Sequence, residues 1–169
     1  LASAILLTTS EKIAEQTVAQ IDRQLPKLSR REIISKSLDR FGAVVVCESM
    51  EEAVSFANEL APEHLEVCAA NPMEYIGKID NAGSVFLGEY SPEPLGDYFA
   101  GPNHVLPTGG TAKFSSPLSV DDFVKKSSFI CYTKEALGGV AGRIADFAER
   151  EGLSAHARSI ACRFAKEDA

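Results

Sequence analysis

A carboxylate and an imidazole stand side by side at Glu63 and His64, between a helix-like segment that ends at Pro62 and a strand-like segment that begins at Leu65. Two bases of different strength suit two proton transfers on one substrate. Open α/β sheets build their sites at the carboxyl ends of strands, whereas this turn precedes its strand. A solvated surface turn is therefore the competing interpretation.

Asp97 and His104 form a second acidic and imidazole pair, in a segment rich in Gly and Pro. Gly96 and Gly101 are expected to supply unusual backbone angles there. A carboxylate and an imidazole on such a stiffened loop could bind a borderline cation such as zinc. A Gly/Pro turn in which Asp97 makes an Asx hydrogen bond explains the same spacing, and both interpretations stay open.

A third pair lies near the C-terminal end, where His156 falls in the first turn of a predicted helix, five residues after Glu151. A histidine and a carboxylate at this spacing could meet a ligand. A solvent-facing helix residue is the simpler alternative for His156.

Hydrophobic spacing in the first part of the chain predicts strands that alternate with helices. The strands are expected at residues 4–7, 43–47, 65–68 and 84–87, and helices after Ser10, after capping boxes at 29–32 and 49–52, and from Pro72. The run 43–47 is apolar on both faces, which is typical of an interior strand of a parallel sheet. This order predicts an α/β fold with right-handed crossovers.

The sequence of residues 88–118 is rich in Gly and Pro and shows little hydrophobic periodicity, which predicts a long loop. A loop of this length is usually functional or disordered. A helix capped near Ser119 and a short strand at 128–132 should follow. Further helices are expected from Thr133 to Arg150, with a packing or kink site at its two glycines, and from a Ser154 cap to about Lys166. We predict part of a Rossmann-like parallel-sheet domain at 1–117 and a small, mostly helical domain at 118–169.

Composition narrows the classes of partner. With 17 basic and 24 acidic residues the net charge is −7, which disfavours nucleic acid and anionic membranes. The longest apolar run, 41–47, is far shorter than the ~20 residues of a membrane-spanning helix. No signal peptide is visible, and the missing initiator Met indicates a processed or truncated chain. The four cysteines form no C-x-x-C pair and are expected to be buried free thiols, which suits the cytoplasm.

Five segments together resemble the closing part of the histidinol dehydrogenase family, in the family's own order. They are APEHL at 61–65, AGSVFLG at 82–88, GDY at 96–98, GPNHVLPT at 101–108 and LSAH at 153–156. The resemblance runs from near residue 1 to near residue 165. It implies the oxidation of L-histidinol to L-histidine through an aldehyde, with two NAD molecules as hydride acceptors.

The resemblance also implies roles for single residues. His64 would be the general base for the alcohol proton, and Glu63 would activate the water that hydrates the aldehyde. Asp97 and His156 would be zinc ligands, whereas substrate would be contacted by His64, His104, Asp97, Glu151 and His156. The zinc ion would orient the substrate, and a two-fold homodimer would exchange the C-terminal arm that carries His156.

The chain departs from the family in length, because the family enzyme is more than twice as long. Its upstream half supplies most of the nucleotide-binding region and two more zinc ligands, and no G-x-G-x-x-G loop occurs here. No NAD-binding residue can therefore be named. We expect a portion of the enzyme that is inactive alone and binds neither zinc nor NAD tightly; the alternative is a non-catalytic α/β assembly module.

Overall fold

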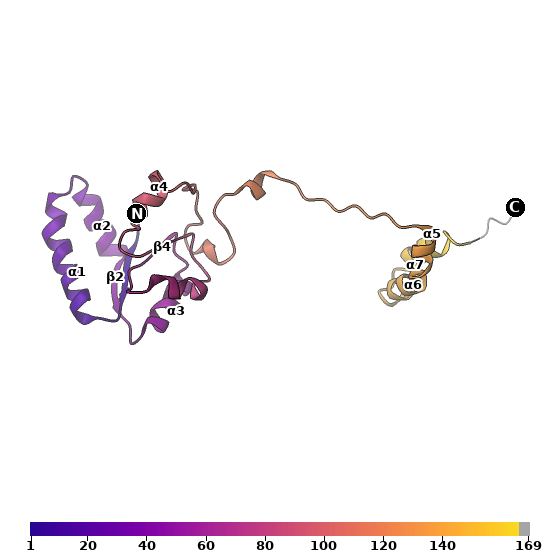
Figure 1. Cartoon of the computed structure of the whole chain (residues 1–169), viewed down its shortest axis with the longest axis horizontal. Helices are drawn as coiled ribbons and strands as arrows, with labels where there is room; N and C mark the ends of the chain where they lie inside the picture. Colours follow the sequence, from indigo (N-terminus) through magenta and orange to yellow (C-terminus); the bar gives the residue numbers. More distant parts are fainter. Residues whose placement is uncertain (166–169) are drawn as a thin grey trace. The chain divides into compact units, whose positions relative to one another are not determined.

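The computed structural model describes residues 1–165 as two compact units, Leu1–Phe123 and a second unit that begins at Val124 (Figure 1). Each unit is described by itself. The sequence placed this boundary near Pro117, a few residues earlier in the chain. In the described part, no helix is both long enough and apolar enough to cross a membrane.

The alternating pattern predicted parallel strands of one sheet, and the described part of the first unit contains parallel strands in two small sheets. In one, β1 (Ala4–Thr8) pairs with β2 (Gly42–Val46) in a register from Ala4 opposite Gly42 to Thr8 opposite Val46. The connection runs through α1 (Glu11–Gln24), the 3₁₀ turn η1 (Leu25–Lys27) and α2 (Arg31–Phe41). Parallel strands need such a long crossover, which is why the helices alternate with strands.

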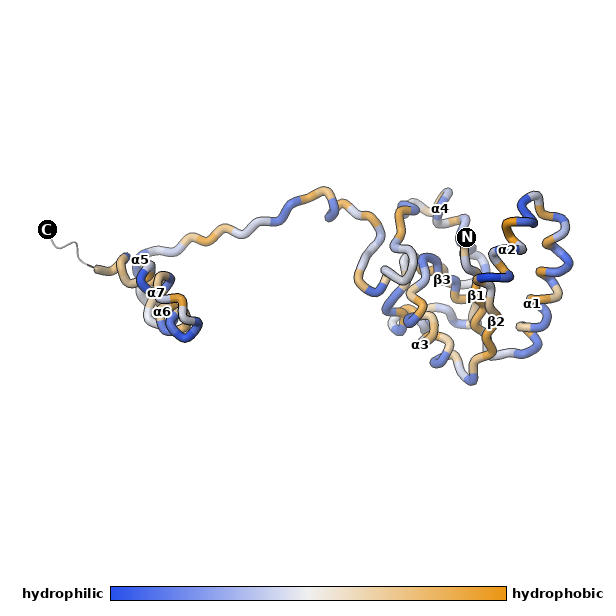
Figure 2. Tube along the Cα trace, turned by 180° about the vertical axis from the view of Figure 1, so that it is seen from behind, coloured by the Kyte–Doolittle hydropathy of each residue, from blue (hydrophilic) through white to orange (hydrophobic). Residues whose placement is uncertain are grey.

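The prediction that β2 is an interior strand is wrong for this chain. Among the described residues β2 pairs with β1 alone, and Val44 and Val46 remain 38% and 47% exposed. Figure 2 shows both strands as apolar along their length. The apolar pattern of β2 predicts a strand that is covered on both faces. The described residues cover β2 only in part.

Of the three serine caps predicted before residue 60, two are confirmed. Ser10 accepts a hydrogen bond from the backbone N–H of Ile13, and Ser49 accepts one from that of Glu52. Ser29 does not cap α2, which begins after Arg30 without a side-chain cap. The reason is local: the backbone N–H of Arg31 donates to the carbonyl of Leu28 across a turn, at 3.3 Å, so the helix starts one residue later.

The second sheet pairs β3 (His64–Val67) with β4 (Ser84–Leu87), in a register from His64 opposite Ser84 to Val67 opposite Leu87. Helix α3 (Met50–Leu60) leads into β3, and the 3₁₀ helix η2 (Pro72–Lys78) lies between the strands. Helix α3 ends at Ala61, which is fully buried and left-handed with φ 48°. Pro62 then prevents any continuation of the helix.

Asn58 on α3 fastens the segment that leads into β4. Its side-chain amide donates to the carbonyl of Lys78 at 2.8 Å, and its side-chain oxygen accepts from the N–H groups of Asp80 and Asn81. Asn81 returns a hydrogen bond to the carbonyl of Asn58 at 3.0 Å. One half-buried side chain therefore sets where β4 begins.

The long segment 88–118 is not structureless, because it contains α4 (Glu93–Tyr98) and the 3₁₀ turn η3 (Thr111–Lys113). Pro94 is tolerated in the first turn of α4, where a backbone N–H would have no helical partner. Gly96 is helical, so the expectation of an unusual angle there is wrong. A Cβ at Gly96 would lie 2.7 Å from the ring of Phe86, so the glycine permits close packing instead. Gly101 does have the expected positive φ, 105°.

The first unit closes with the 3₁₀ turn η4 (Val120–Phe123), near the predicted Ser119 cap, and the second unit follows. The predicted helix from Thr133 to Arg150 is two helices, α5 (Lys134–Gly138) and α6 (Ala141–Arg150), broken at the predicted glycines. The hydroxyl of Thr133 caps α5.

Helix α7 (Ser154–Ala161) packs on α6 (Figure 1). Ser154 does not cap it, because Leu153 occupies the N-cap position and Ser154 is already helical. The predicted helix end at Lys166 lies outside the described residues.

Two further predictions fail in physically related ways. Residues 128–132 form no strand, since no described segment pairs with them, and Phe129 is 95% exposed. Of the four free thiols only Cys47 is buried, whereas the other three are exposed: Cys68, Cys131 and Cys162. Apolar neighbours in sequence predict burial only where another segment covers them.

Replacing Asn58 with Ala should destabilise the first unit by about 1–3 kcal/mol, because backbone groups of the segment before β4 lose their partners. The measurement is urea unfolding followed by circular dichroism. Glu59→Ala, at the neighbouring exposed position of α3, is the matched control. Equal midpoints for the two variants would contradict the assigned role of Asn58.

Gly96→Ala should also destabilise this unit, by about 1–3 kcal/mol, because the added methyl overlaps the Phe86 ring. Gly77→Ala is the control, since a Cβ at Gly77 meets nothing within 4 Å. Thermal unfolding of both variants provides the comparison. A Gly96→Ala protein as stable as Gly77→Ala would mean that α4 does not pack closely on β4.

Candidate active site

His64 is the first residue of β3, and the alternation of the strand fixes which face it occupies. Side chains two apart on a strand share a face, so His64 and Glu66 lie on the same side of β3. Their partners on β4 are Ser84 and Phe86. The rings of His64 and Phe86 have centroids 5.9 Å apart, at an angle of 41°. The site is thus built on a face of the β3–β4 sheet and not beyond its carboxyl edge.

Glu63 occupies the turn before β3, and its backbone is held firmly. Its carbonyl accepts a hydrogen bond from the N–H of Ser84 at 2.8 Å, and the N–H of Gly83 donates to the carbonyl of Pro62 at 2.9 Å. A Cβ at Gly83 would lie 2.6 Å from the Glu63 carbonyl oxygen. This close backbone approach needs glycine. The Glu63 side chain is half-buried.

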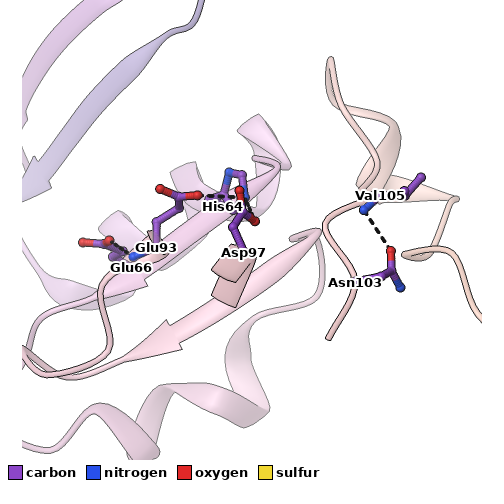
Figure 3. A network of polar contacts seen from close by, with 6 residues as sticks. All are labelled: His64, Glu66, Glu93, Asp97, Asn103 and Val105. Carbon is purple, nitrogen blue, oxygen red and sulfur yellow. Dashed lines mark hydrogen bonds and ion pairs between the residues drawn. The ribbon is translucent and has the colours of Figure 1, made fainter. Parts of the chain in front are cut away.

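Helix α4 lies over this face and is attached to it through Glu66. The Glu66 carboxylate accepts a hydrogen bond from the backbone N–H of Glu93, the first residue of α4, at 2.8 Å. Glu93 and Asp97 are four residues apart on the helix, so their side chains lie on the same side. Figure 3 shows both carboxylates directed at the ring of His64.

The three side chains converge on one nitrogen atom. Nε2 of His64 lies 3.8 Å from Oε1 of Glu93 and 3.9 Å from Oδ1 of Asp97. That nitrogen is buried and has no hydrogen-bond partner among residues 1–165, although the His64 side chain as a whole is 27% exposed. A buried nitrogen without a hydrogen bond is energetically unfavourable. A shorter contact to a carboxylate, an added proton or a bound ligand would remove this cost.

Electrostatics at this cluster favour added positive charge. Burial raises the pKa of the Glu93 carboxyl above its ordinary value, and the hydrogen bond and charge of Asp97 raise it further. The Glu66 charge acts in the same direction, and His64 opposes it. Carboxylates held this close bind a proton or a cation more readily than isolated ones.

The donor set of the cluster is of the type that binds a divalent metal. One ligand atom each from His64, Glu93 and Asp97 lies within 4.8 Å of the other two, a combination found among the described residues. Imidazole nitrogen and carboxylate oxygen are both zinc ligands. Sequence reasoning placed Asp97 and His64 among the candidates but missed Glu93. The four-residue spacing between Glu93 and Asp97 was the signal that could have identified Glu93. Such spacing indicates a shared side only on a helix, and the sequence of 88–118 predicted a loop.

His104 lies in the loop after α4, is exposed, and does not belong to the cluster of His64 and Asp97. Its neighbour Asn103 stiffens the loop: the side-chain oxygen accepts from the N–H of Val105 at 2.8 Å, and the side-chain amide donates to the carbonyl of Leu118 at 2.5 Å. An Asx-type bond therefore exists in this segment, but Asn103 makes it and not Asp97 (Figure 3).

Glu151 and His156 belong to the second unit. Glu151 is the C-cap of α6, and its N–H donates to the carbonyl of Phe147 at 3.1 Å. His156 lies in the first turn of α7. Both side chains are exposed and available to a ligand or another surface.

The chain is similar to known proteins over nearly its whole length. Among curated proteins, the chain is 57% identical over 164 residues to the histidinol dehydrogenase of Caldanaerobacter subterraneus, covering 97% of this chain and 38% of the relative. It is 58% identical over 166 residues to that of Halalkalibacterium halodurans, covering 98% of this chain and 39% of the relative. The chain thus spans less than two fifths of these relatives.

A solved structure agrees with these relatives. The crystal structure of histidinol dehydrogenase from Elizabethkingia anophelis superposes with a TM-score of 0.87 at 43% identity, covering 94% of this chain and 36% of that one. The sequence model of the family described as "Histidinol dehydrogenase" matches residues 1–164. This chain belongs to the histidinol dehydrogenase family.

Proposed function

We propose that this chain is part of an enzyme that oxidises L-histidinol to L-histidine through histidinal, with two NAD molecules as hydride acceptors, the last step of histidine biosynthesis. Family membership supports this reaction, and the convergence of Glu93 and Asp97 on His64 is the observation that supports a site for it. The activity belongs to the complete protein, because the chain spans about 38% of its relatives.

The proton transfers are assigned to adjacent residues. His64 takes the alcohol proton as the substrate carbon gives up its first hydride, and the alcohol becomes an aldehyde. Glu63 then removes a proton from water as the oxygen adds to the aldehyde carbon, and protonated His64 returns its proton to the aldehyde oxygen, which gives the hydrate and restores the base. His64 accepts a proton from this hydrate as the second hydride leaves, which yields the carboxylic acid, and loss of the acid proton to solvent gives the carboxylate. The rigid Glu63 backbone and the cover of α4 support this assignment, because general bases act only when they are held within reach of the proton.

A zinc ion fits the cluster, since the carboxylates of Glu93 and Asp97 lie close together and favour added positive charge. Asp97 would hold it, with His156 of the partner subunit as a second ligand, and the remaining ligands would come from outside these 169 residues. Zinc would orient the substrate by binding its imidazole and amine. His104 and Glu151 would contact the substrate. The described residues include no glycine-rich phosphate loop, so none of them is assigned to NAD binding.

The complete protein is proposed to be a cytoplasmic homodimer in which the second unit completes the site of the partner subunit. The second unit has a thin core, with Ala148 and Ala157 as its buried apolar residues in the described part. The extended segment before α5 exposes Phe129 and Ile130, which would be covered in a dimer. A two-fold axis allows both subunits to make the same exchange.

The function is tested with the complete protein, histidinol and NAD, by following NADH absorbance. His64→Asn should slow both half-reactions by about 10²–10⁴-fold, because a general base is lost. Glu63→Gln should slow histidinal oxidation more than histidinol oxidation. Wild-type protein that produces no NADH would refute the function, whereas equal mild losses in both variants would refute only the division of roles.

The 169-residue chain alone should produce no measurable NADH from histidinol, since hydride transfer requires cofactor and substrate carbon in near-contact. It should also fail to retain stoichiometric zinc after dialysis against a mild chelator, because Asp97 and His156 supply fewer ligands than a stable site needs. Metal analysis and the NADH assay are the two measurements. Activity of the chain that His64→Ala abolishes would contradict the first expectation.

Mixed dimers test the arm exchange. One full-length subunit carries His64→Asn and the other His156→Ala, each inactive as a homodimer. If the second unit serves the partner's site, the mixed dimer has one doubly damaged site and one intact site, so activity returns. Verified mixing without recovery would place His156 in the site of its own subunit.

A further inference from the structure

One atom of the cluster has an environment that the assigned roles do not explain. Nε2 of His64 is buried and faces the carboxylates of Glu93 and Asp97 at 3.8 and 3.9 Å (Figure 3). These distances are roughly 0.9 Å longer than an ordinary N–H···O contact of about 2.9 Å. Catalytic hydrogen bonds are often long in a ligand-free site and tighten later.

The identity of the facing groups determines which form of the ring is favoured. A neutral imidazole carries one N–H donor and one lone pair, on different nitrogens. A lone pair on Nε2 would point at carboxylate oxygens, which are acceptors, and would be repelled. An N–H on Nε2 would instead be attracted to them. The carboxylates therefore favour the ring with Nε2 protonated and with the lone pair on Nδ1.

Glu93 is well placed to exert this control. Its backbone is held by Glu66 through the 2.8 Å hydrogen bond, and both residues lie on the face that carries His64. The ring of Phe86 also lies beside the imidazole, with its centroid 5.9 Å from that of His64. Glu93 and Asp97 are half-buried on α4, whereas Glu89, before the helix, is exposed.

We propose that Glu93 is a positioning residue for His64: its carboxylate, held over the sheet face by Glu66, faces Nε2 and keeps the ring in the form protonated on that atom, which leaves Nδ1 as the basic nitrogen. The catalytic consequence rests on the proposed function, because it concerns the proton that His64 would accept. The preference for one ring form does not, since it follows from the cluster alone.

The direct test is nitrogen NMR of the imidazoles in the metal-free 169-residue chain, at a fixed pH where histidine is neutral. The chain has three histidines, so His64→Asn identifies the signals of His64. Wild-type chain should show the Nε2–H form, Glu93→Gln should move the two nitrogen shifts of His64 toward each other, and Glu89→Gln should leave them unchanged. An Nδ1–H form in wild type, or unchanged shifts in Glu93→Gln, would overturn the proposal.

Kinetics of the complete protein provide the second readout. Glu93→Gln should lower kcat for histidinol oxidation by about 10–100-fold, the usual effect of losing a residue that orients a catalytic group, with KM nearly unchanged. Glu93→Asp should recover part of the loss, and Glu89→Gln should have wild-type kcat. An unchanged kcat in Glu93→Gln, or a loss matched by loss of bound zinc, would overturn the positioning role. A wild-type protein without activity would refute the proposed function and leave the NMR result standing.

Discussion

The site depends on the packing of one short helix against one face of a two-stranded sheet. Helix α4 is held at its first residue by the Glu66 carboxylate and along its length by the close approach of Gly96 to Phe86. A six-residue helix is far too short to be stable by itself, so these contacts determine whether it exists. Without them Glu93 and Asp97 would have no fixed relation to His64.

Strand alternation explains why this arrangement is economical in residues. His64 and Glu66 share a face because they are two apart on β3, so the strand that carries the imidazole also carries the anchor for α4. The anchor then brings in Glu93 and Asp97, which share a side because they are four apart. Two periodicities, of strand and of helix, convert four positions in sequence into one cluster in space.

Much of this was predictable from the sequence, and the failures share a cause. All four strands of the first unit and its long helices follow apolar periodicity, and Ser10, Ser49 and Thr133 cap helices as predicted. Helix α4 was not predictable, because Pro94 and Gly96 are typical of loops and its stability comes from distant contacts. Glu93 was missed with it.

Burial was the least predictable property. The apolar residues of β2, the segment 128–132 and three of the cysteines indicated covered positions, yet they are exposed in the described part of the chain. Hydrophobic periodicity indicates that a surface is suited to packing, but it does not indicate which segment packs on that surface. The same limit applies to His156, which is exposed on its own unit and whose proposed role depends on another surface.

The most direct test of this account is the imidazole NMR spectrum of His64 after substitution of Glu66. Glu66→Ala removes the acceptor that holds the N–H of Glu93, so α4 should loosen and the His64 signals should shift, while those of His156 stay in place. Glu66→Gln keeps an acceptor oxygen and should preserve the wild-type His64 signals. Unchanged His64 signals in Glu66→Ala, or equal shifts in both variants, would contradict the claim that the docking of α4 through Glu66 assembles the site.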